Sequence, residues 1–575
     1  MKTKAKYSVA IIVAALIILN LQSSIITSVT SLFPGSVTGC ELYAQSPPWI
    51  WAKSAAGSDY DEAHGIGLDA NGNIYISGIF WSPTVSFDAI IIENAGGAFS
   101  PSDIFLAKYD PYGNAVWARA YGGDKSEVCF HMSVDATGNS YITGYFKSSS
   151  ITFGSTVLTN PDPGTEVFYM AKVDADGNVV WAKSAAGDDY VWGLGVAADG
   201  GGNSYAVGMF YGDSVVFDAY TLHNAGGRDI FLVKYDVNGN VVWVRSAGGA
   251  EDDLAVGIYA DAEGYTYTTG AFMSSTITFG PYTLTNDPGL REDIFVVKVD
   301  PEGSAVWATS AGGTWDDTGL NLAVDHNGNC FVTGLFQSDQ ITFGTTTLVN
   351  AGLANDVFVV KYNAQGNVQW AVSAGGDYYD TGNDIAVDAF GNAYVTGYFE
   401  SSSITFGSNT FMNAGAWDVF LVSYDAGGNL IYATQVGAAD GEEAYAVTVD
   451  ANRRAYVSGY FQSTSLSFGS YTLINQGYPD IFVAKIEAAP LGVYEVSVSN
   501  SFSVYPNPSD GWIMVQSMNG AGQFLITDMT GKVMYEGKLH TLNTTKIDCS
   551  DLPKGMYIAR FIQEGKESTA KVVIE

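Results

Sequence analysis

Asp103–Phe153 reads DIFLAKYDPYGNAVWARAYGGDKSEVCFHMSVDATGNSYITGYFKSSSITF, and most of the 575-residue chain repeats this phrase. The motif at the start of this segment recurs at Asp229, Asp293, Asp356, Asp418 and Asp480, and a less similar copy begins at Glu166. Self-similarity at a fixed period indicates a repeat architecture, in which no unit buries its apolar face alone and each unit stacks on its neighbours.

The tryptophan after each Gly-Asn turn measures the period. It falls at Trp51, Trp117, Trp181, Trp243, Trp307 and Trp370, and Tyr432 holds the seventh place. The spacing is about 63 residues, and the unit contains no helix-like segment. This pattern excludes the helical solenoids and is typical of a propeller blade of four strands with one longer loop.

Each unit reads as strands joined by tight turns. Apolar and polar residues alternate in Asp103–Tyr109 and Ala115–Ala120, which is the periodicity of a strand. The DPYGN between them is a turn, because Asp bonds its own backbone and Gly supplies a positive φ. A second hairpin joins His131–Val134 to Ser140–Phe146 through DATGN, and a short apolar segment from Ile151 fills the connection to the next DIF-type strand.

The two ends of the array complement each other. It opens on a lone Trp strand at Trp49, and it closes at Asp480 with DIFVAKI and no Trp strand after it. Pairing the two fragments completes seven blades and closes the ring, which removes exposed sheet edges. We therefore expect an all-β chain, with a seven-bladed β-propeller over residues 49–487 and each marker tryptophan docked between neighbouring blades.

A second domain follows the array. Residues 488–501 read as a linker, and residues 502–575 as a small unit of short strands and turns. Because turn sequences separate its apolar runs, strands are expected at Trp512–Gln516, Phe524–Asp528, Val533–Tyr535, Met556–Ile562 and Lys571–Ile574. This pattern predicts a compact β-sandwich.

Residues 1–45 are interpreted as a signal peptide. Lysines at positions 2, 4 and 6 precede the apolar run Val9–Leu21, which is too short for a membrane span and suits the core of a signal peptide. Cleavage is expected between Ala44 and Ser46, which leaves no transmembrane segment in the mature chain. The alternative is a lipoprotein, since Val37-Thr38-Gly39-Cys40 resembles a lipobox that would place a lipid on Cys40.

Charge and residue types exclude several functions. The formal net charge is −34 at pH 7, so nucleic acid is not an expected partner, since phosphate binding needs a basic face. Cys129, Cys330 and Cys549 show neither disulfide nor metal spacing and are expected to be buried free thiols. The five histidines lie in different phases and are expected to be ordinary strand or loop residues: His64, His131, His223, His326 and His540.

The array over 49–487 resembles the SBBP family of β-propeller repeats. The residues that carry the resemblance are D-x-F-x-x-K-Y-D-x-x-G-N-x-x-W, as at Asp229–Trp243, and D-x-x-G-N-x-Y-x-x-G-x-F, as at Asp388–Phe399. The resemblance implies a seven-bladed propeller and carries no single activity with it.

Residues 502–575 resemble the sorting domain of type IX secretion cargo from the Bacteroidota. The matching residues are Tyr505-Pro506-Asn507-Pro508-Ser509 with Gly511, then Asp528, Gly531, Lys532 and Val533, then Leu552-Pro553-Lys554-Gly555-Met556-Tyr557, and the closing Lys571-Val572-Val573-Ile574. The resemblance implies the type IX secretion machinery as a partner and delivery, by way of the periplasm, to the outer cell surface or the medium. It also implies removal of the domain, with release of the protein or its attachment to surface polysaccharide.

One loop recurs after every Trp strand and is acidic each time. It begins at Gly57, Gly123, Gly187, Gly249, Gly313, Gly376 and Ala439. In a propeller this loop joins the outermost strand of one blade to the innermost strand of the next, so we expect all copies around the mouth of the central channel. The candidate ligand-binding residues on this acidic loop face are Asp59, Asp61, Asp188, Asp189, Asp252, Asp253, Trp315, Asp316, Asp317, Asp377, Tyr378 and Asp380.

Three interpretations of these loops stay open. They form a solvated acidic rim with packing aromatics, or a face that binds sugars or Ca²⁺, or a catalytic site in which paired carboxylates hydrolyse glycosides. Acidic pairs occur in every unit, so no catalytic residue is singled out, and no cofactor is expected. We expect an exported, non-catalytic binding or structural module, with a polysaccharide or a surface protein as a possible partner. The alternative is a carbohydrate-active enzyme, a glycoside hydrolase or lyase, on the same face.

Overall fold

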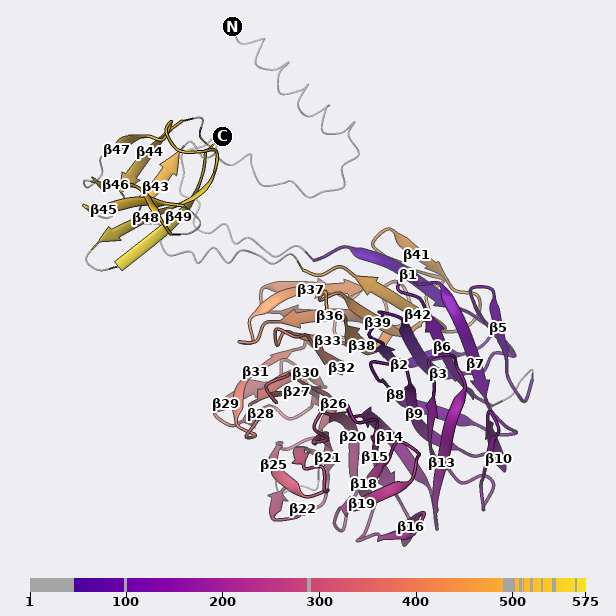
Figure 1. The fold of residues 1–575 in the computed structure, drawn as a ribbon. Helices are drawn as coiled ribbons and strands as arrows, with labels where there is room; N and C mark the ends of the chain where they lie inside the picture. Colours follow the sequence, from indigo (N-terminus) through magenta and orange to yellow (C-terminus); the bar gives the residue numbers. More distant parts are fainter. Residues whose placement is uncertain are drawn as a thin grey trace. The chain divides into compact units, whose positions relative to one another are not determined.

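The computed structural model describes residues 46–97, 101–286, 291–489 and 502–574, the last range with gaps at 506–508, 510, 518–520, 529–530, 540–543 and 564–565 (Figure 1). The signal-peptide and Cys40 predictions, and most of the predicted linker, lie outside these residues. The propeller and the C-terminal unit are described separately below.

The repeat array folds into four-stranded antiparallel sheets, here called blades and numbered in chain order. The innermost strands of blades 1 to 7 are β2 (Asp61–Leu68), β8 (Glu127–Val134), β14 (Val191–Ala198), β20 (Asp253–Ala260), β26 (Asp317–Val324), β32 (Asp380–Val387) and β38 (Glu442–Val449). The second strands are β3 (Ile74–Phe80), β9 (Ser140–Phe146), β15 (Ser204–Phe210), β21 (Thr266–Phe272), β27 (Cys330–Phe336), β33 (Ala393–Phe399) and β39 (Ala455–Phe461).

The outer half of each blade comes from the DIF-type strand and the Trp strand. The third strands are β6 (Asp103–Tyr109), β12 (Val167–Val173), β18 (Asp229–Tyr235), β24 (Asp293–Val299), β30 (Asp356–Tyr362), β36 (Asp418–Tyr424) and β42 (Asp480–Ile486). The outermost strands are β7 (Ala115–Tyr121), β13 (Val179–Gly187), β19 (Val241–Ala247), β25 (Ala305–Ala311), β31 (Val368–Ala374), β37 (Leu430–Val436) and β1 (Trp49–Ala55). Among the described residues, seven sheets contain this order of innermost, second, third and outermost strand.

The blades form a ring. Their innermost strands contact one another in a closed cycle, from β2 through β8, β14, β20, β26 and β32 to β38 and back to β2 (Figure 1). Each junction between blades has its own apolar core, to which the second and third strands of both neighbours contribute. The prediction of a β-propeller is confirmed.

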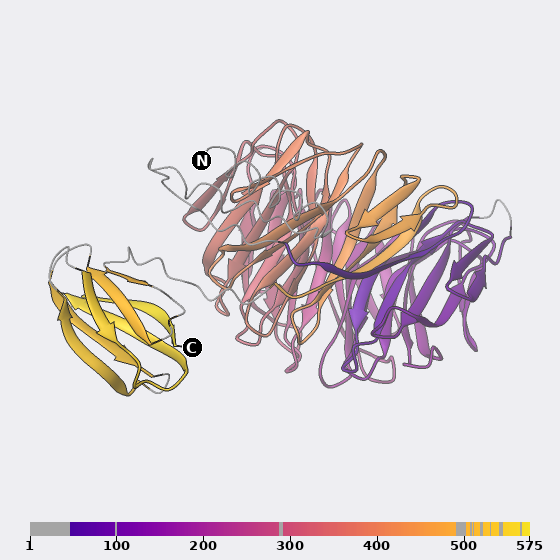
Figure 2. The ribbon, with the colours of Figure 1, turned by 90° about the horizontal axis from the view of Figure 1, so that it is seen from above.

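The first strand of the array completes the last blade. β1 pairs antiparallel with β42, so that Trp51 lies opposite Lys485 and Ala55 lies opposite Ile481. Figure 2 shows β1, in indigo, beside the orange strands of blade 7. The predicted sharing of one sheet by the two ends is confirmed, and it pairs the strand edge that β42 would otherwise expose.

The apolar segment predicted to fill a connection forms a two-stranded hairpin instead. These hairpins are β4 (Thr84–Phe87) with β5 (Ile90–Glu93), β10 (Ser150–Phe153) with β11 (Thr156–Thr159), β16 (Ser214–Phe217) with β17 (Tyr220–His223), β22 (Thr276–Phe279) with β23 (Tyr282–Thr285), β28 (Gln340–Phe343) with β29 (Thr346–Val349), β34 (Ser403–Phe406) with β35 (Asn409–Met412), and β40 (Ser465–Phe468) with β41 (Tyr471–Ile474). Hairpin β4–β5 contacts both β7 of its own blade and β1 of blade 7. The hairpins therefore bridge the outermost strands of neighbouring blades.

The aspartate of each D-x-x-G-N turn organises that turn. Asp69 Oδ1 accepts hydrogen bonds from the backbone N–H groups of Asn71 (2.9 Å) and Asn73 (3.0 Å). Its Oδ2 accepts from the Asn73 side-chain amide (2.7 Å) and from the Tyr75 hydroxyl (3.2 Å). Gly72 has a φ of 78°, which only glycine adopts without strain. The phrase D-x-x-G-N-x-Y is therefore one hydrogen-bonded unit.

The marker tryptophans lie between blades, as predicted. The Trp243 ring is 7% exposed, and its Nε1–H donates to the Pro301 carbonyl in a turn of blade 4 at 3.0 Å. Lys234 Nζ donates to the same carbonyl at 3.1 Å and lies 5.2 Å from the centre of the Tyr205 ring. The corresponding indole bond recurs at Trp117, Trp181, Trp307 and Trp370.

The C-terminal unit is a sandwich of two sheets. One sheet contains β43 (Phe502–Tyr505), β44 (Trp512–Ser517) and β47 (Thr544–Asp548), and the other contains β46 (Val533–Leu539), β45 (Gly522–Thr527), β48 (Gly555–Gln563) and β49 (Lys566–Ile574). Phe502 and Ile513 of the first sheet pack in one cluster with Phe524 and Phe561 of the second. The predicted sandwich is confirmed, and β43 and β47 are strands that the sequence pattern did not indicate.

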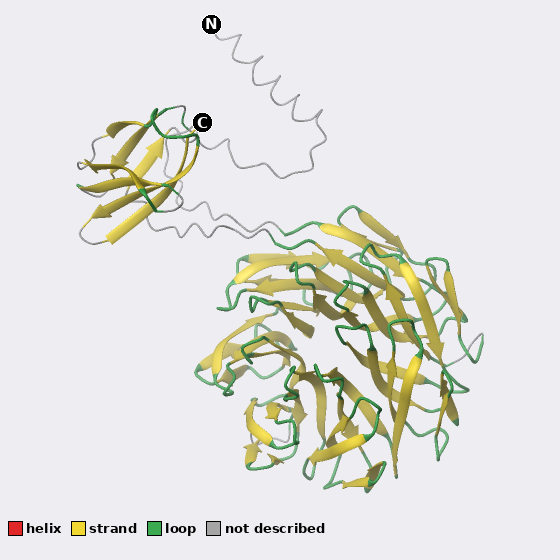
Figure 3. Cartoon of the chain, viewed as in Figure 1, coloured by secondary structure: helices red, strands yellow, loops and turns green. Residues whose placement is uncertain are grey.

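The described residues contain strands, turns and loops without a helix, which confirms the predicted all-β class (Figure 3). Accordingly, none of these residues belongs to a helix able to cross a membrane. Cys129, Cys330 and Cys549 are buried free thiols, as predicted.

Candidate functional site

The first residue of most innermost strands is a buried acid. Four of the predicted ligand-binding residues hold this place and have no exposed surface: Asp61, Asp253, Asp317 and Asp380. Asp61 Oδ2 accepts a hydrogen bond of 2.7 Å from the Ser82 hydroxyl, and equivalent bonds join the other three to Ser274, Ser338 and Ser401. These carboxyl groups lie beneath the loops and tie each innermost strand to the segment after the second strand. Their predicted place on the exposed loop face is therefore wrong.

A second buried acid lies under the same loop. It is the first residue of the third strand in six blades: Asp103, Asp229, Asp293, Asp356, Asp418 and Asp480. Burial, together with the charge of Asp480, raises the pKa of Asp61 to about 8, and burial raises the pKa of Asp480 to about 6. Between blades 2 and 3, Val167 and Val191 replace both acids at once. The acid that opens an innermost strand and the acid that opens the third strand of the preceding blade therefore form a structural pair. Both are present at six junctions, and both are absent at the junction of blades 2 and 3.

The other predicted acids lie in the loops and bind close neighbours. Asp252 forms an ion pair with Arg228 (2.7 Å), and Asp316 forms one with Arg291 (3.4 Å), whose guanidinium lies 5.1 Å from the exposed Trp315 ring. The remaining acids accept hydrogen bonds within a loop or from a nearby serine, and Tyr378 is exposed; the acids are Asp59, Asp188, Asp189 and Asp377.

The loop acids do not assemble a calcium site in the described residues. In that part of the chain, no group of three or more His, Cys, Asp or Glu side chains could hold a metal ion. Ca²⁺ takes six to eight oxygen ligands, whereas the predicted acids in the loops each bind a close neighbour in the loops or blades. We therefore do not propose Ca²⁺ as a ligand.

Stacked rings cross the loop face at the junction of blades 2 and 3. This aromatic strip consists of Phe130, Tyr145, Trp192, Tyr190 and Tyr211. Trp192 stacks on Tyr145 with ring centres 5.3 Å apart, and it lies 5.8 Å from Phe130 and 5.6 Å from Tyr190. Tyr190 stacks on Tyr211 at 5.4 Å, and Tyr211 is 42% exposed. The strip runs from an innermost strand outward to the surface.

Charged pairs flank the aromatic strip. Lys147 bonds Glu166 at 2.7 Å and lies 6.0 Å from the Tyr145 ring centre. Burial raises the pKa of Tyr190, and the ion pair of Arg228 and Asp252 lies close enough to act on its charge. The raised pKa keeps the Tyr190 hydroxyl group neutral at physiological pH, beside groups that donate and accept hydrogen bonds.

The innermost strands of blades 1, 6 and 7 carry a polar cluster. His64 Nε2 lies 3.1 Å from Glu62 Oε2, and its ring meets Tyr445 edge-on at 4.8 Å. The Asn383 side-chain amide donates to Glu443 Oε1 at 2.9 Å. Burial, and secondarily the charge of Glu62, raises the pKa of Glu443 to about 7. The matching positions of blades 2, 3 and 4 are apolar: Val128, Phe130, Trp192, Leu194, Leu254 and Val256.

Three polar side chains meet across the central channel. The Asn321 side-chain amide donates to Asp384 Oδ1 at 2.6 Å, and its Nδ2 lies 3.4 Å from His131 Nε2. Enclosure raises the pKa of Asp384 to about 7 and lowers the pKa of His131 to about 4. Each is the fifth residue of its strand, where the other innermost strands have Gly65, Gly195, Gly257 and Ala446. The small residues leave room for this network, here called the waist.

A cavity of about 360 Å³ lies beside the waist. The last residues of all the innermost strands line it, among them Leu68, Val134 and Val449. It is therefore at the end of the channel where the D-x-x-G-N turns lie, opposite the acidic loops. Sequence reasoning missed the waist, although long polar residues at a position otherwise held by Gly or Ala were a readable signal.

Two family models match parts of the chain. Residues 503–575 match the Secretion system C-terminal sorting domain, and residues 369–398 match the SBBP Beta-propeller repeat. The resemblances seen in the sequence are thereby confirmed. The protein carries a type IX secretion sorting domain and is exported to the cell surface or secreted.

The curated relatives are distant and longer. The chain is 23% identical over 530 residues to the uncharacterized WD repeat-containing protein L264 of Acanthamoeba polyphaga mimivirus, which covers 76% of this chain and 38% of that protein. It is 24% identical over 275 residues to the regulatory protein FlaEY of Caulobacter vibrioides, which covers 45% of this chain and 29% of that protein. The chain thus spans well under two thirds of the length of either relative.

The similar solved structures are also remote in sequence. Sqt1 from Chaetomium thermophilum is 9% identical with a TM-score of 0.34, over 75% of this chain and 85% of that chain. A mutant of Synechocystis apocarotenoid oxygenase is 10% identical with a TM-score of 0.33, over 78% of this chain and 95% of that chain. Neither similarity assigns an activity.

Proposed function

We propose that this exported propeller is a non-catalytic module that binds an uncharged polysaccharide on its loop face. The aromatic strip carries this proposal, because it presents stacked, partly exposed rings beside hydrogen-bonding groups. The sorting domain delivers the protein to a compartment where it meets polysaccharide of the cell surface or of the surroundings.

The chemistry of the strip suits sugar rings. Aromatic rings offer flat apolar faces, and binding sites combine such faces with a few placed polar groups that fix orientation. At the strip, Tyr190 and Tyr211 supply the faces, while Asp252 and Arg228 supply an acceptor and a donor. A net charge of −34 repels acidic polymers, which favours an uncharged chain of sugars.

Affinity electrophoresis and calorimetry with uncharged glucans, xylans and mannans test the proposal. We expect the full-length protein to bind one class of these polymers, and Tyr190→Ala and Tyr211→Ala each to weaken binding about tenfold, as loss of one well-packed ring does. The control is Tyr112→Ala, which removes an 80% exposed ring from a turn of blade 1. Absence of binding to every polymer, or equal binding by all variants, would contradict the proposal.

A second candidate function rests on Glu443. Its pKa of about 7 keeps a large share of this carboxyl protonated at neutral pH, and Glu62 and His64 lie in the same cluster. A neutral acid beside a second carboxylate is the arrangement that glycoside hydrolases use. Under this alternative the protein releases reducing sugar from the polymer it binds, and Glu443→Gln abolishes release while binding persists. A binding module leaves the polymer intact.

A further inference from the structure

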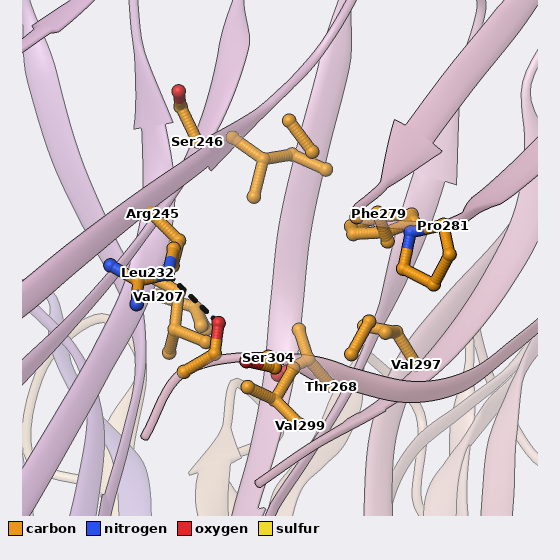
Figure 4. A pocket seen from close by; sticks show the side chains of 15 residues that line it. Val207, Leu232, Arg245, Ser246, Thr268, Phe279, Pro281, Val297, Val299 and Ser304 are labelled. Atoms are coloured by element: carbon orange, nitrogen blue, oxygen red, sulfur yellow. Dashed lines mark hydrogen bonds between the residues drawn. The ribbon is translucent and has the colours of Figure 1, made fainter. Parts of the chain in front are cut away.

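An apolar cavity of about 340 Å³ lies between blades 3 and 4, outside the loop face and the channel. Figure 4 shows Val207 and Leu232 of blade 3 on one side and Phe279 and Val297 of blade 4 on the other. Its volume is at the lower end of the range for sites that hold small molecules. Arg245, Ser246 and Pro281 line it as well and are exposed, so the cavity is open to solvent.

The cavity exists because one repeat lacks a tyrosine that other repeats have. The last residue of the third strand is a buried tyrosine in blades 1, 3, 5 and 6: Tyr109, Tyr235, Tyr362 and Tyr424. Its ring lies beside the marker tryptophan of the preceding blade, as Tyr235 does at 5.9 Å from Trp181. In blade 4 this residue is Val299, which lines the cavity.

Blade 2 also lacks the tyrosine, but a neighbour fills the space. Its third strand ends in Val173, and the outermost strand of blade 1 ends in Tyr121, where the other outermost strands have Ala or Val in this place. The Tyr121 ring lies 4.8 Å from Phe153 of the blade 2 hairpin, and both rings pack in one buried cluster with Val173. The missing ring is thus replaced from the other side of the junction.

Blade 7 also lacks the tyrosine, and a residue of its own outermost strand fills the space. Its third strand ends in Ile486, and Trp49 opens its outermost strand, with its ring 4.9 Å from Phe468 of the hairpin. At the junction of blades 3 and 4 the two residues that could compensate are Ala247 of blade 3 and Ala305 of blade 4, and both line the cavity. Neither side fills the space, so it stays open.

The wall of the cavity holds an unpartnered hydroxyl. Thr268 is 3% exposed, and its Oγ1 has no hydrogen-bond partner among the described residues. The same position is apolar in the other blades: Ile76, Ile142, Ala206, Val332, Val395 and Val457. A buried hydroxyl without a partner is costly, so this threonine departs from the repeat at the junction that contains the cavity.

We propose that this cavity binds a small neutral phenol with a short apolar para substituent. Its ring takes the space that tyrosine fills in other repeats, and its hydroxyl forms the hydrogen bond that Thr268 Oγ1 lacks. Arg245 lies at the rim of the cavity, but its guanidinium group already donates to the carbonyls of Gly303 (2.8 Å), Glu302 (2.9 Å) and Val244 (2.8 Å). The ligand therefore does not need a negative charge to pair with it. Apart from Arg245, Ser246, Thr268 and Ser304, the side chains that line the cavity are apolar, which suits a neutral aromatic molecule.

Titration of the full-length protein with p-cresol tests the proposal, with calorimetry and Trp fluorescence as readouts and toluene as the comparison ligand. We expect saturable binding of p-cresol, and affinity about tenfold weaker for toluene, which is the difference that one hydrogen bond makes. Thr268→Val should remove this preference and leave toluene affinity unchanged. Equal affinity for both ligands in the unmodified protein would overturn the assignment of Thr268.

Variants that place a larger side chain inside the cavity test whether p-cresol binds there. Val299→Tyr restores the residue of the sibling repeats and should raise the melting temperature while abolishing p-cresol binding. Ala305→Leu fills the same space from the outermost strand, where blade 6 has Leu430, and serves if the first variant folds poorly. The matched control is Val173→Tyr in blade 2, which should lower the melting temperature and leave binding intact. No saturable binding of p-cresol, or binding that survives both filled variants, would overturn the proposal.

Discussion

Trp51 and Lys485 are strand partners, although they belong to the first and the last strand of the repeat array. This pairing closes the ring of blades, because β1 supplies the outermost strand that blade 7 would otherwise lack. Stability of the whole array therefore depends on a segment of seven residues near its beginning.

Removal of residues 46–55 should open the ring. The edge of β42 loses its partner, and exposed edges promote association between chains, so we expect oligomers by size-exclusion chromatography and a lower melting temperature. A synthetic peptide of residues 46–56 added in trans should restore the monomer, whereas a scrambled peptide should not. A truncated protein that stays monomeric with an unchanged melting temperature would show that closure is dispensable.

Trp243→Ala should destabilise the junction of blades 3 and 4. The change removes a ring that is 7% exposed and the indole bond to the Pro301 carbonyl, and loss of a buried aromatic ring typically costs about 3–5 kcal/mol. Urea unfolding followed by circular dichroism measures the effect. Tyr112→Ala, on an exposed turn, should change the unfolding free energy by less than about 0.5 kcal/mol. Equal midpoints for the two variants would refute the docking role of Trp243.

The buried acids should make the fold lose stability as pH rises. Burial raises the pKa of Asp317 to about 7 from an ordinary value of 3.8. Between these values the native protein holds a proton that the unfolded chain has released, so the free energy of unfolding falls as pH increases. Each tenfold difference in proton affinity is worth about 1.4 kcal/mol, and the loss ends once the folded group has ionised.

Asp317→Asn isolates this effect. The amide oxygen still accepts a hydrogen bond from the Ser338 hydroxyl, which Asp317 Oδ2 accepts at 2.7 Å in the unmodified protein, but the side chain no longer titrates. Urea unfolding at several values between about pH 4 and pH 8 should give a shallower slope for the variant than for the parent. Parallel slopes would show that Asp317 has the same proton affinity in both states.

Asn321→Ala should destabilise the waist. The change removes the amide that donates to Asp384 Oδ1 at 2.6 Å, while the backbone N–H groups of Ile385 and Val447 still donate to the carboxyl group. Loss of one hydrogen bond to a buried polar group costs roughly 1–3 kcal/mol. Thermal unfolding measures this loss. Asp384→Ala should cost less in the Asn321→Ala chain than in the unmodified protein, because one of the hydrogen bonds that Asp384 accepts is already gone. If the double variant is as unstable as the sum of the single variants, the two side chains are not coupled.

Deletion of residues 502–575 should abolish export. The deleted segment contains the matched sorting domain, so a host with type IX secretion should retain the shortened protein in its periplasm. Cell fractionation with surface proteolysis measures the location of the protein. The retained propeller should still unfold at the temperature of the full-length propeller, which separates a sorting defect from misfolding. Unchanged delivery to the surface would contradict the role of this domain.

The repeated motif predicted the ring of blades, because the contacts that shape each unit join residues close in sequence and recur in every unit. Asp69, Asn73 and Tyr75 lie within one turn, so the phrase that encodes their contacts can be read from the sequence. Ring closure was equally readable, since the fragment at Trp49 and the fragment at Phe482 each lack what the other has. The hairpins between the second and third strands were missed, because a segment as short as Ile151–Leu158 allows either an irregular connection or two very short strands.

The sequence could not show which acids of a loop are buried, because a residue's position in the repeat does not give its depth below the surface. Asp59 and Asp61 are two residues apart in an acidic loop, yet only Asp61 is buried, because the Ser82 hydroxyl lies above it in the folded blade. The waist posed a different difficulty. His131 and Asn321 meet across the channel, and the repeat gives the order of the blades around the ring but not the width of the channel that their side chains must span.

Tyr121 of blade 1 fills a space that Val173 of blade 2 leaves, so adjoining units have diverged as matched pairs. Duplication of either unit alone would bring together two bulky rings or two small side chains. Shuffling of such blades, by recombination in nature or by engineering, should therefore succeed only when a unit travels with the neighbour to which it is fitted.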